Sequence, residues 1–468
     1  MITCSEHSYI LISSLPEEER EILDTLQDKK DKILLGGEDF RPFSWEHEKE
    51  ALTLSTSYFL GTDWLVENRL PLHVQSKLDS DQERLNYLEI FSNAFHALDD
   101  FSESDRKEWM KNLFWIDFKA PRIPLVQTQA DGLLLFLIVL FLCSISRIVK
   151  KGLKRSFYIT FQCFKNKIKG RIRLSTTLSS QWNRPIPSVF HCQPQEFGVD
   201  SSENQILKYA LTLCLNCLSN FARLDPDKTR LRALRRQALL CKESFEGVST
   251  VPDIKSLLFS FKNNPIYKEY TEVLSLAKQL IRHCNYGIGF NENQRRETPP
   301  YWINMPKLFE LYVYDQLKEA VGSEGKIQYQ QHIHYQVLDY LCNSTQEGWE
   351  AFIADAKYKP TYKTKGIDME DARQVSGYSR LTKTYTSLKV QDMHSNIRCL
   401  IVYPDNEAPG VLDLRNAVAV HGYEDIYKVG VKLPMCRDCP PGCFSSLTKT
   451  AKGTGLKWRN DRMKMRLD

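Results

Sequence analysis

The chain has 468 residues, of which 42% are apolar and 26% are charged, so it is long enough for two or three domains and has the composition of a folded globular protein. Residues 1–6 lack the basic start and apolar core of a secretory signal, and the 13 cysteines, an odd number, do not suit a disulfide framework. We therefore expect a cytoplasmic protein with reduced thiols.

The charge of the chain is unevenly distributed. Residues 1–131 contain 14 basic and 26 acidic side chains, whereas residues 132–468 contain 49 basic and 32 acidic side chains. The segment from Gly132 to Gln195 has no acidic residue. A basic surface attracts the phosphates of DNA, and an acidic one is repelled by them. We expect the basic part to contact DNA and the acidic front part to bind a protein partner.

Residues 1–131 are expected to form an N-terminal domain of mixed secondary structure. Pro16 precedes a short acidic helix that extends to about residue 32, and residues 52–61 and 70–78 read as two short strands. Residues 132–300 are expected to be mostly helical and basic, with helical periodicity from 203 to about 285 and a loop-rich linker over 286–304.

The middle region begins with an uninterrupted apolar run of 11 residues, Leu133–Cys143. A helix needs about 20 such residues to cross a bilayer. Arg147 and Lys150 follow the run closely. We therefore predict a buried core helix and no membrane contact.

Two groups of basic residues in the middle region are candidates for contact with DNA phosphates. One lies on a basic strand predicted over 165–173 and the other on a helix. A solvated surface that touches no DNA explains either pattern equally well. The six residues are Lys169, Arg171, Arg173, Arg232, Arg235 and Arg236.

Residues 301–435 are expected to form a C-terminal domain that carries the chemistry. Tyr335–Leu341 reads as a strand with Asp339, and Ala351–Tyr358 as a second strand with Asp355 and Lys357. Because side chains alternate along a strand, the last two residues should lie on one face. Two carboxylates and an ammonium at neighbouring strand ends suit a Mg²⁺-dependent phosphodiesterase, in which the acids hold the ion and the lysine assists the attacking water.

Two flanking helices are expected to complete this group. Apolar residues at helical spacing predict a helix over Met305–Leu317, from which Glu310 would point toward the metal. Gln374 and Tyr378 are four positions apart in a second predicted helix and so share one face. The expected metal ligands are Glu310, Asp339 and Asp355, and the whole candidate site is Glu310, Asp339, Asp355, Lys357, Gln374 and Tyr378.

The D…D-x-K pattern followed by Q-x-x-x-Y resembles the PD-(D/E)xK nuclease superfamily. The run from Leu308 to Tyr378 resembles McrC, the nuclease subunit of bacterial restriction systems that act on modified cytosine. The resemblance extends to Glu196–Lys208 and, more loosely, to Tyr58–Lys77, where relatives usually have proline in the place of Ser76.

This resemblance implies an α+β multidomain chain with a restriction-endonuclease-like α/β core at its C-terminal end. It implies that Gln374 and Tyr378 position the DNA strand beside Mg²⁺, and that the chain defends its host against phage and foreign DNA carrying 5-methylcytosine. It also implies that the N-terminal region binds a hexamer of an McrB-like AAA+ GTPase and stimulates GTP hydrolysis. The chain has no G-x-x-x-x-G-K-[ST] loop, so GTP is expected on the partner.

A basic tail over residues 436–468 contains the one cysteine motif of the chain, Cys436, Cys439 and Cys443. Three thiols at this spacing, with a fourth upstream such as Cys284, occur in nucleases that hold an iron–sulfur cluster. Zinc with His421 is another interpretation. The short spacing and two intervening prolines favour free, reduced thiols.

Two alternative functions remain open at this stage. The chain could be a self-sufficient DNA repair nuclease of the Q-x-x-x-Y type, in which case it would cut without a GTPase. It could also be a regulatory subunit that activates the GTPase while its own nuclease site is silent.

Overall fold

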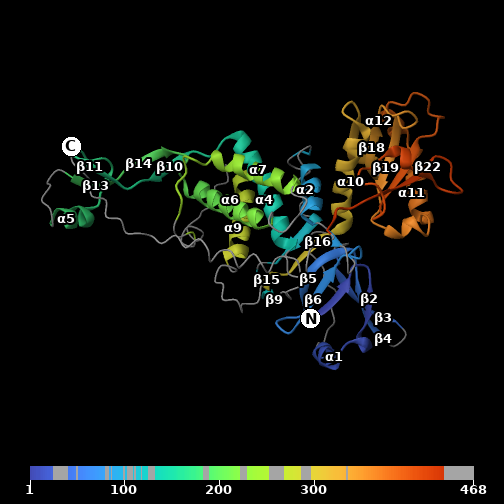
Figure 1. Cartoon of the computed structure of the whole chain (residues 1–468), viewed down its shortest axis with the longest axis horizontal. Helices are drawn as coiled ribbons and strands as arrows, with labels where there is room; N and C mark the ends of the chain where they lie inside the picture. The colour runs from blue at the N-terminus through green and yellow to red at the C-terminus, as the bar shows by residue number, and fades with distance from the viewer. Residues whose placement is uncertain are drawn as a thin grey trace.

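The computed structural model describes residues 1–24, 41–48, 51–79, 84–85, 87–97, 101–102, 109, 112–117, 119–124, 132–182, 189–221, 229–251, 254, 268–285, 297–333 and 336–436. These residues form both helices and strands, which confirms the expected mixture of α and β structure. Figure 1 shows a blue N-terminal region beside an orange-to-red C-terminal region, a central group of helices, and a strand module that extends away from it.

The N-terminal region contains two sheets. The larger has the strand order β1-β6-β5-β16-β8, and the smaller has the order β2-β4-β3. Leu70, Leu72 and Val74 of β6 are at most 2% exposed, which is the period-two pattern of a strand that buries one face. The elements are β1 (Ile2–Ser5), β2 (Tyr9–Leu11), α1 (Glu17–Asp24), β3 (Phe43–Glu48), β4 (Ala51–Thr56), β5 (Phe59–Val66), β6 (Leu70–Gln75), β8 (Phe114–Ile116) and β16 (Tyr301–Asn304).

The strand predicted over residues 52–61 is in fact two strands, β4 and β5, which belong to different sheets. The predicted loop-rich linker is also wrong for residues 297–304, which form β15 (Glu297–Thr298) and β16; its residues 286–296 lie outside the described part of the chain. Gly61 permits the close approach of β16, since a Cβ there would lie 1.9 Å from the carbonyl oxygen of Tyr301. The Trp302 indole N–H donates to Asp63 Oδ2 at 2.9 Å, across 239 positions of sequence.

The central helices surround α4 (Gly132–Lys151), the apolar helix of the middle region. It packs against α2, α6, α7 and α9, and Phe136, Leu137 and Ile138 are fully buried, which confirms the prediction of a core helix. Among the described helices, only α4 has the length and apolar composition of a membrane span, and 67% of its most apolar window is buried inside the protein. The other helices are α2 (Tyr87–Ala97), α6 (Ser202–Phe221), α7 (Thr229–Glu243) and α9 (Lys268–Asn285).

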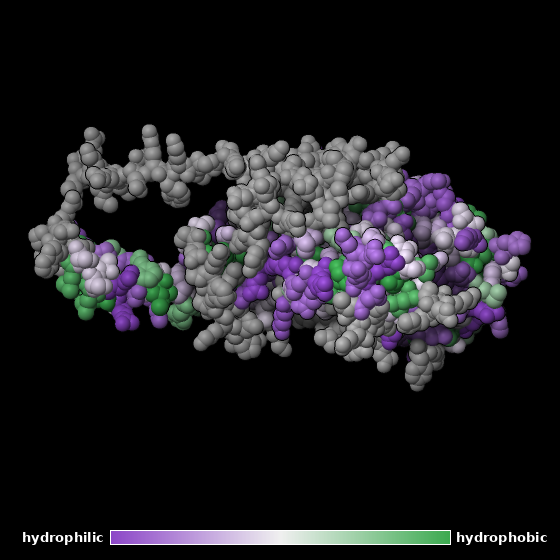
Figure 2. Space-filling view, turned by 90° about the horizontal axis from the view of Figure 1, so that it is seen from below, coloured by the Kyte–Doolittle hydropathy of each residue, from purple (hydrophilic) through white to green (hydrophobic). Residues whose placement is uncertain are grey.

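The strand module interrupts the helical region between α4 and α6, so residues 132–300 contain more strand than predicted. The basic strand expected over 165–173 is instead the end of β11, a turn through Gly170 at φ 76°, and β12. Figure 2 shows apolar and polar side chains mixed on this module, where Phe157 and Phe161 are 72% and 67% exposed. Its elements are β10 (Ser156–Ile159), β11 (Gln162–Lys165), β12 (Arg171–Ile172), α5 (Leu174–Trp182), β13 (Val189–Gln193) and β14 (Gln195–Gly198).

The C-terminal region is a six-stranded sheet with the order β17-β18-β19-β20-β22-β21, covered by helices on both faces. The pairs β17–β18 and β18–β19 are antiparallel, whereas β19–β20 and β20–β22 are parallel. Its elements are α10 (Met305–Val321), β17 (Lys326–Ile333), β18 (Gln336–Asn343), β19 (Ala351–Ala356), α11 (Met369–Ser379), α12 (Thr382–Leu388), β20 (Arg398–Pro404), β21 (Val418–Ala419) and β22 (Ile426–Val431).

The two faces of this sheet bury different helices because neighbouring residues of β19 point in opposite directions. Phe352 and Ala354 pack in the same core cluster as Phe309 of α10, whereas Ile353 packs with Tyr378 of α11 and Tyr385 of α12. Two short ladders join distant segments: β9 (Ile123–Pro124) pairs with β15, and β7 (Arg84–Leu85) pairs with β23 (Met435–Cys436).

Candidate active site

Asp355 and Asp339 lie side by side on two antiparallel strands of the C-terminal sheet, close to the end of β19. The register Tyr340↔Ala354 makes them the next residues of β18 and β19. Asp339 Oδ2 accepts a hydrogen bond from the backbone N–H of Ala356 at 3.0 Å, which fixes its carboxylate at the strand end. Asp355 is only 2% exposed. The hairpin predicted from the sequence therefore brings the two acids together.

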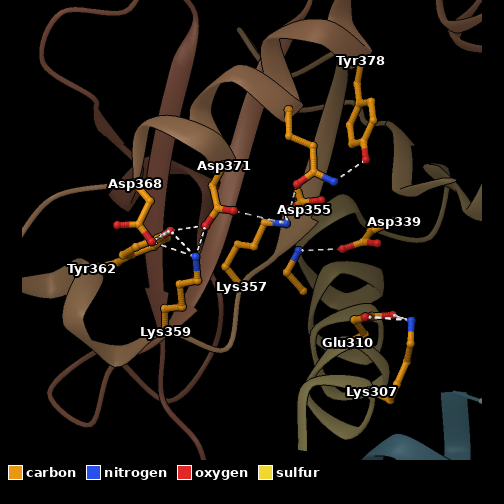
Figure 3. Close-up of polar contacts among 12 residues, drawn as sticks. Lys307, Glu310, Asp339, Asp355, Lys357, Lys359, Tyr362, Asp368, Asp371 and Tyr378 are labelled. Atoms are coloured by element: carbon orange, nitrogen blue, oxygen red, sulfur yellow. Dashed lines mark hydrogen bonds and ion pairs between the residues drawn. The ribbon is translucent and has the colours of Figure 1, made fainter. Parts of the chain in front are cut away.

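Lys357 follows β19 and connects Asp355 to the helix α11 (Figure 3). Its Nζ lies 2.9 Å from Asp355 Oδ2 and donates to Gln374 Oε1 at 2.9 Å. The side-chain amide of Gln374 in turn donates to the Tyr378 hydroxyl. Asp355 and Lys357 are two positions apart at the end of a strand, and Gln374 and Tyr378 are four positions apart in a helix, as expected. Their contacts form one continuous polar line from Asp355 to Tyr378.

Glu310 reaches the same region from α10, on the other face of the sheet from α11. The helix begins at an N-cap formed by Asn304, whose side chain accepts from the N–H of Lys307, with a proline in its first turn. Both oxygens of Glu310 accept from Lys307 Nζ at 3.0 Å, and the Tyr340 hydroxyl donates to the Glu310 carbonyl at 2.6 Å. The helix is thereby tied to β18, which carries Asp339.

We call Glu310, Asp339, Asp355 and Lys357 the carboxylate cluster. Burial, followed by repulsion from Asp355 and Glu310, raises the pKa of Asp339 well above its ordinary value. Burial also raises the pKa of Glu310, and Asp355 adds to this rise while Lys307 opposes it. Burial disfavours the charged form of Lys357, but the attraction of its carboxylate neighbours outweighs it and raises the pKa of the ammonium. The three carboxylates of the cluster carry more charge than Lys357 and the neighbouring Lys307 offset.

A divalent cation would supply the missing positive charge. Asp355 Oδ2 is buried and lies 2.9 Å from Lys357 Nζ; a carboxylate oxygen with one partner still has a lone pair for a ligand. Three carboxylates are hard oxygen donors of the kind that Mg²⁺ prefers. In the part of the chain that the structure describes, no three His, Cys, Asp or Glu side chains are arranged as a metal site, since Asp339 and Glu310 each face a partner of their own. The residue types and burial fit Mg²⁺.

A second group of polar side chains beside the first was missed by the sequence analysis. We call Lys359, Tyr362, Asp368 and Asp371 the lysine cluster (Figure 3). Lys359 Nζ donates to Asp368 at 2.7 Å and to Asp371 at 2.8 Å, and Tyr362 donates to both carboxylates. Asp371 also lies 3.8 Å from Lys357 Nζ. The helical spacing of Asp371 with Gln374 and Tyr378 was the available signal.

The basic candidates lie away from this site. Lys169, Arg171 and Arg173 are on the strand module, at the opposite end of the molecule from the C-terminal sheet in Figure 1. The other three, Arg232, Arg235 and Arg236, are exposed on α7 in the central helices.

The cysteine candidates are only partly described. Cys436 ends β23, Cys284 lies in α9 and His421 is an exposed turn residue, while Cys439 and Cys443 lie outside the described residues.

Comparison with known protein families then gives a match. The family described as "McrBC 5-methylcytosine restriction system component" matches residues 85–390, which include all six candidate site residues. The chain belongs to this family. The resemblance expected from the sequence is therefore confirmed at the level of the McrBC system.

Among solved structures, one similar chain comes from the "Refined half-complex from tetradecameric assembly of Thermococcus gammatolerans McrB AAA+ hexamers with bound McrC". It shares 14% identity with this member of the McrBC family over 92% of this chain and 94% of that chain, with a TM-score of 0.40. Another similar chain comes from the "Cryo-EM structure of the Thermococcus gammatolerans McrBC complex". It is 14% identical to this chain, the match covers 70% of this chain and 89% of that chain, and the TM-score is 0.28. No curated protein matches the chain.

Proposed function

We propose that this chain is a cytoplasmic McrC-type endonuclease subunit that hydrolyses phosphodiester bonds of DNA containing modified cytosine. The observation that carries the proposal is the polar line Asp355–Lys357–Gln374–Tyr378, which lies beside Asp339 and Glu310 within the part that matches the McrBC family. An ordered acid, acid, lysine and Q-x-x-x-Y set of this kind resembles the pattern of the PD-(D/E)xK nucleases. The six-stranded sheet with helices on both faces supports a PD-(D/E)xK core.

Glu310, Asp339 and Asp355 would hold Mg²⁺, since these three carboxylates have only two ammonium groups beside them, Lys307 at Glu310 and Lys357 at Asp355. When bound, Mg²⁺ activates water and offsets the negative charge of the reacting phosphate. The ammonium of Lys357 is held by Asp355 and Gln374, so it presents a fixed positive charge to the attacking water or the phosphate oxygens. The exposed amide of Gln374 and the hydroxyl of Tyr378 orient the DNA strand next to that lysine.

The partner that we propose is an McrB-like AAA+ GTPase hexamer, whose GTP hydrolysis this chain stimulates. Membership of a multicomponent restriction family supports a partner, and we propose that GTP binds to that partner. The acidic charge of residues 1–131 supports a protein contact there, and defence against phage or foreign DNA follows from the restriction reaction.

Cleavage of a plasmid with Mg²⁺ tests the proposal. Wild type, Asp355→Ala and Asp405→Ala are each incubated with and without the candidate GTPase and GTP, on cytosine-methylated and unmodified DNA. Asp405 is the matched control because it pairs with Lys363 at 2.9 Å, the same distance as the Asp355–Lys357 pair, but lies outside the candidate site.

We expect wild type and Asp405→Ala to cut methylated DNA only in the complete mixture, and Asp355→Ala to cut none. Cutting by the chain alone would instead identify a self-sufficient nuclease. Stimulation of the GTPase without any cutting would identify a regulatory subunit with a silent nuclease site.

A further inference from the structure

A buried polar contact joins the N-terminal sheet to the residue that follows Lys357. The Tyr358 hydroxyl donates to Glu6 Oε1 at 2.7 Å, and Lys77 Nζ donates to the Tyr358 carbonyl at 3.1 Å. The same ammonium lies 4.3 Å from the ring centres of Tyr58 and Tyr358, which is a cation–π geometry on both rings. Tyr358 is therefore held by its side chain and by its backbone at once.

This contact is costly to bury. Glu6 is 1% exposed; its Oε1 also accepts from Ser76 Oγ at 3.3 Å, whereas its Oε2 is buried without a hydrogen-bond partner. Burial raises the pKa of Glu6, and burial lowers the pKa of Lys77 to about 8. Apolar side chains would stabilise the same interface at lower cost. Buried charged groups with shifted pKa values gather at functional sites, so the contact points to a role in function.

Two elements of the candidate site are attached to this one sheet. Tyr358 directly follows Lys357 and is fixed by Glu6 and Lys77, which follow strands β1 and β6. The helix α10, which carries Glu310, directly follows β16 of the same sheet, and the N–H of Met305 donates to the Tyr58 carbonyl at 3.1 Å. The N-terminal sheet therefore contacts both of the segments that carry Lys357 and Glu310.

We propose that Glu6 and Lys77 are positioning residues of the nuclease centre, which hold Lys357 in place through Tyr358. The inference rests on the proposed nuclease function and deepens it. Neither residue contacts the carboxylate cluster, so each acts through the backbone of residues 357–358. Because the N-terminal region is the proposed binding region for the GTPase, this contact links that region to the position of Lys357.

The variants Glu6→Gln and Tyr358→Phe test the proposal in the full-length chain, with Thr62→Val as the matched control. Thr62 is 0% exposed and donates to the Leu72 carbonyl at 2.8 Å, so its loss removes a buried hydrogen bond of the same sheet without touching Tyr358. Hydrogen exchange of residues 357–363 reports the position of the loop without any activity. The kcat and KM for methylated plasmid, measured with the GTPase partner, report the chemistry.

We expect Glu6→Gln and Tyr358→Phe to speed exchange of residues 357–363 severalfold and to lower kcat by about ten- to a hundredfold at unchanged KM, because a small misplacement of a reacting group has an effect of this size. The kcat of the double variant should be no lower than that of the less active single variant, because both substitutions remove the same contact between Glu6 and Tyr358. Thr62→Val should leave both readouts at wild-type values.

The proposal is overturned if Glu6→Gln and Tyr358→Phe keep the wild-type kcat and the wild-type exchange rate of residues 357–363. It is also overturned if Thr62→Val changes both readouts equally, because the loss of kcat then reflects only a loss of stability. If the wild-type complex cuts no DNA, the proposed function fails, and exchange alone then decides the positioning role. Faster exchange in Glu6→Gln would still support it, and unchanged exchange would overturn it.

Discussion

The carboxylate cluster and the lysine cluster are neighbours in the C-terminal region, but they differ in charge balance. In the lysine cluster, hydrogen bonds from Lys359 and Tyr362 lower the pKa of Asp368, and bonds to its acids outweigh burial to raise the pKa of Lys359. In the carboxylate cluster, burial and mutual repulsion raise the pKa of Asp339. The pKa of Asp368 is lowered by a cation that it already has, whereas burial and two neighbouring carboxylates outweigh the attraction of Lys357 at Asp339. The first arrangement is structural, and the second is suited to an incoming metal ion.

The two lysines that follow β19 provide the largest expected contrast. Lys357→Met should lower methylated-plasmid cleavage by about a thousandfold, since it removes the fixed charge next to the reacting phosphate. Lys359→Met should retain cleavage within about tenfold, because Lys359 pairs with Asp368 and Asp371 instead. Initial rates in the complete mixture measure both, and an equal loss in the two variants would remove the distinction between the clusters.

The helix α11 sharpens the same comparison at a smaller scale. Gln374→Leu should reduce cleavage by about ten- to a hundredfold, because Lys357 loses the amide that orients it. Tyr378→Phe should have a smaller effect, since the hydroxyl contacts Gln374 and not the lysine. Single-turnover rates with saturating complex rank the two variants, and a larger loss in Tyr378→Phe would contradict the order of the polar line.

Stability should respond in opposite directions in the two clusters. Without metal at neutral pH, Asp339→Asn should raise the free energy of unfolding by about 1 kcal/mol, because it removes a repelled buried charge while its oxygen still accepts from Ala356. Asp368→Asn should lower it by about 0.5 kcal/mol, since the ion pair with Lys359 is largely exposed. Urea unfolding monitored by tryptophan fluorescence measures both, and a destabilised Asp339→Asn variant would show that the cluster is already balanced.

The pH dependence of metal stabilisation gives the smallest expected effect. The pKa values of Glu310 and Asp339 are raised in the folded chain. The contribution of these two groups to the free energy of unfolding is therefore fully present below the pKa values that they have in the unfolded chain. It is lost as the pH rises through the pKa values that they have in the folded chain. Protons therefore compete with Mg²⁺ in acid. Mg²⁺ should raise the thermal midpoint by a few degrees at about pH 8 and by less at about pH 5. An equal shift at both pH values would place the ion elsewhere.

The local parts of the candidate site were predictable from the sequence. The spacing of Asp355 and Lys357 in a strand and of Gln374 and Tyr378 in a helix determines which side chains meet, and the structure joins all four. The apolar run of α4 was likewise enough to predict a buried helix.

Contacts between distant segments were not predictable. Tyr358 and Glu6 are 352 positions apart, and nothing in either local sequence indicates the other. Most of the strand module was also missed: only one strand was predicted there, over 165–173, because its strands are short, and β12 has only two residues. Short strands give too few alternations for a period-two pattern to stand out.

The place of β16 in the larger N-terminal sheet has a consequence for how the chain is made. β16 lies between β5 and β8, so until residue 304 has been synthesised these two strands have unpaired edges facing each other. Open edges of this kind invite pairing with other chains. A fragment that ends before β16 should therefore aggregate, and the nascent chain must keep its first sheet open while the central helices form. The larger N-terminal sheet is thus completed only when the helix bearing Glu310 is about to follow.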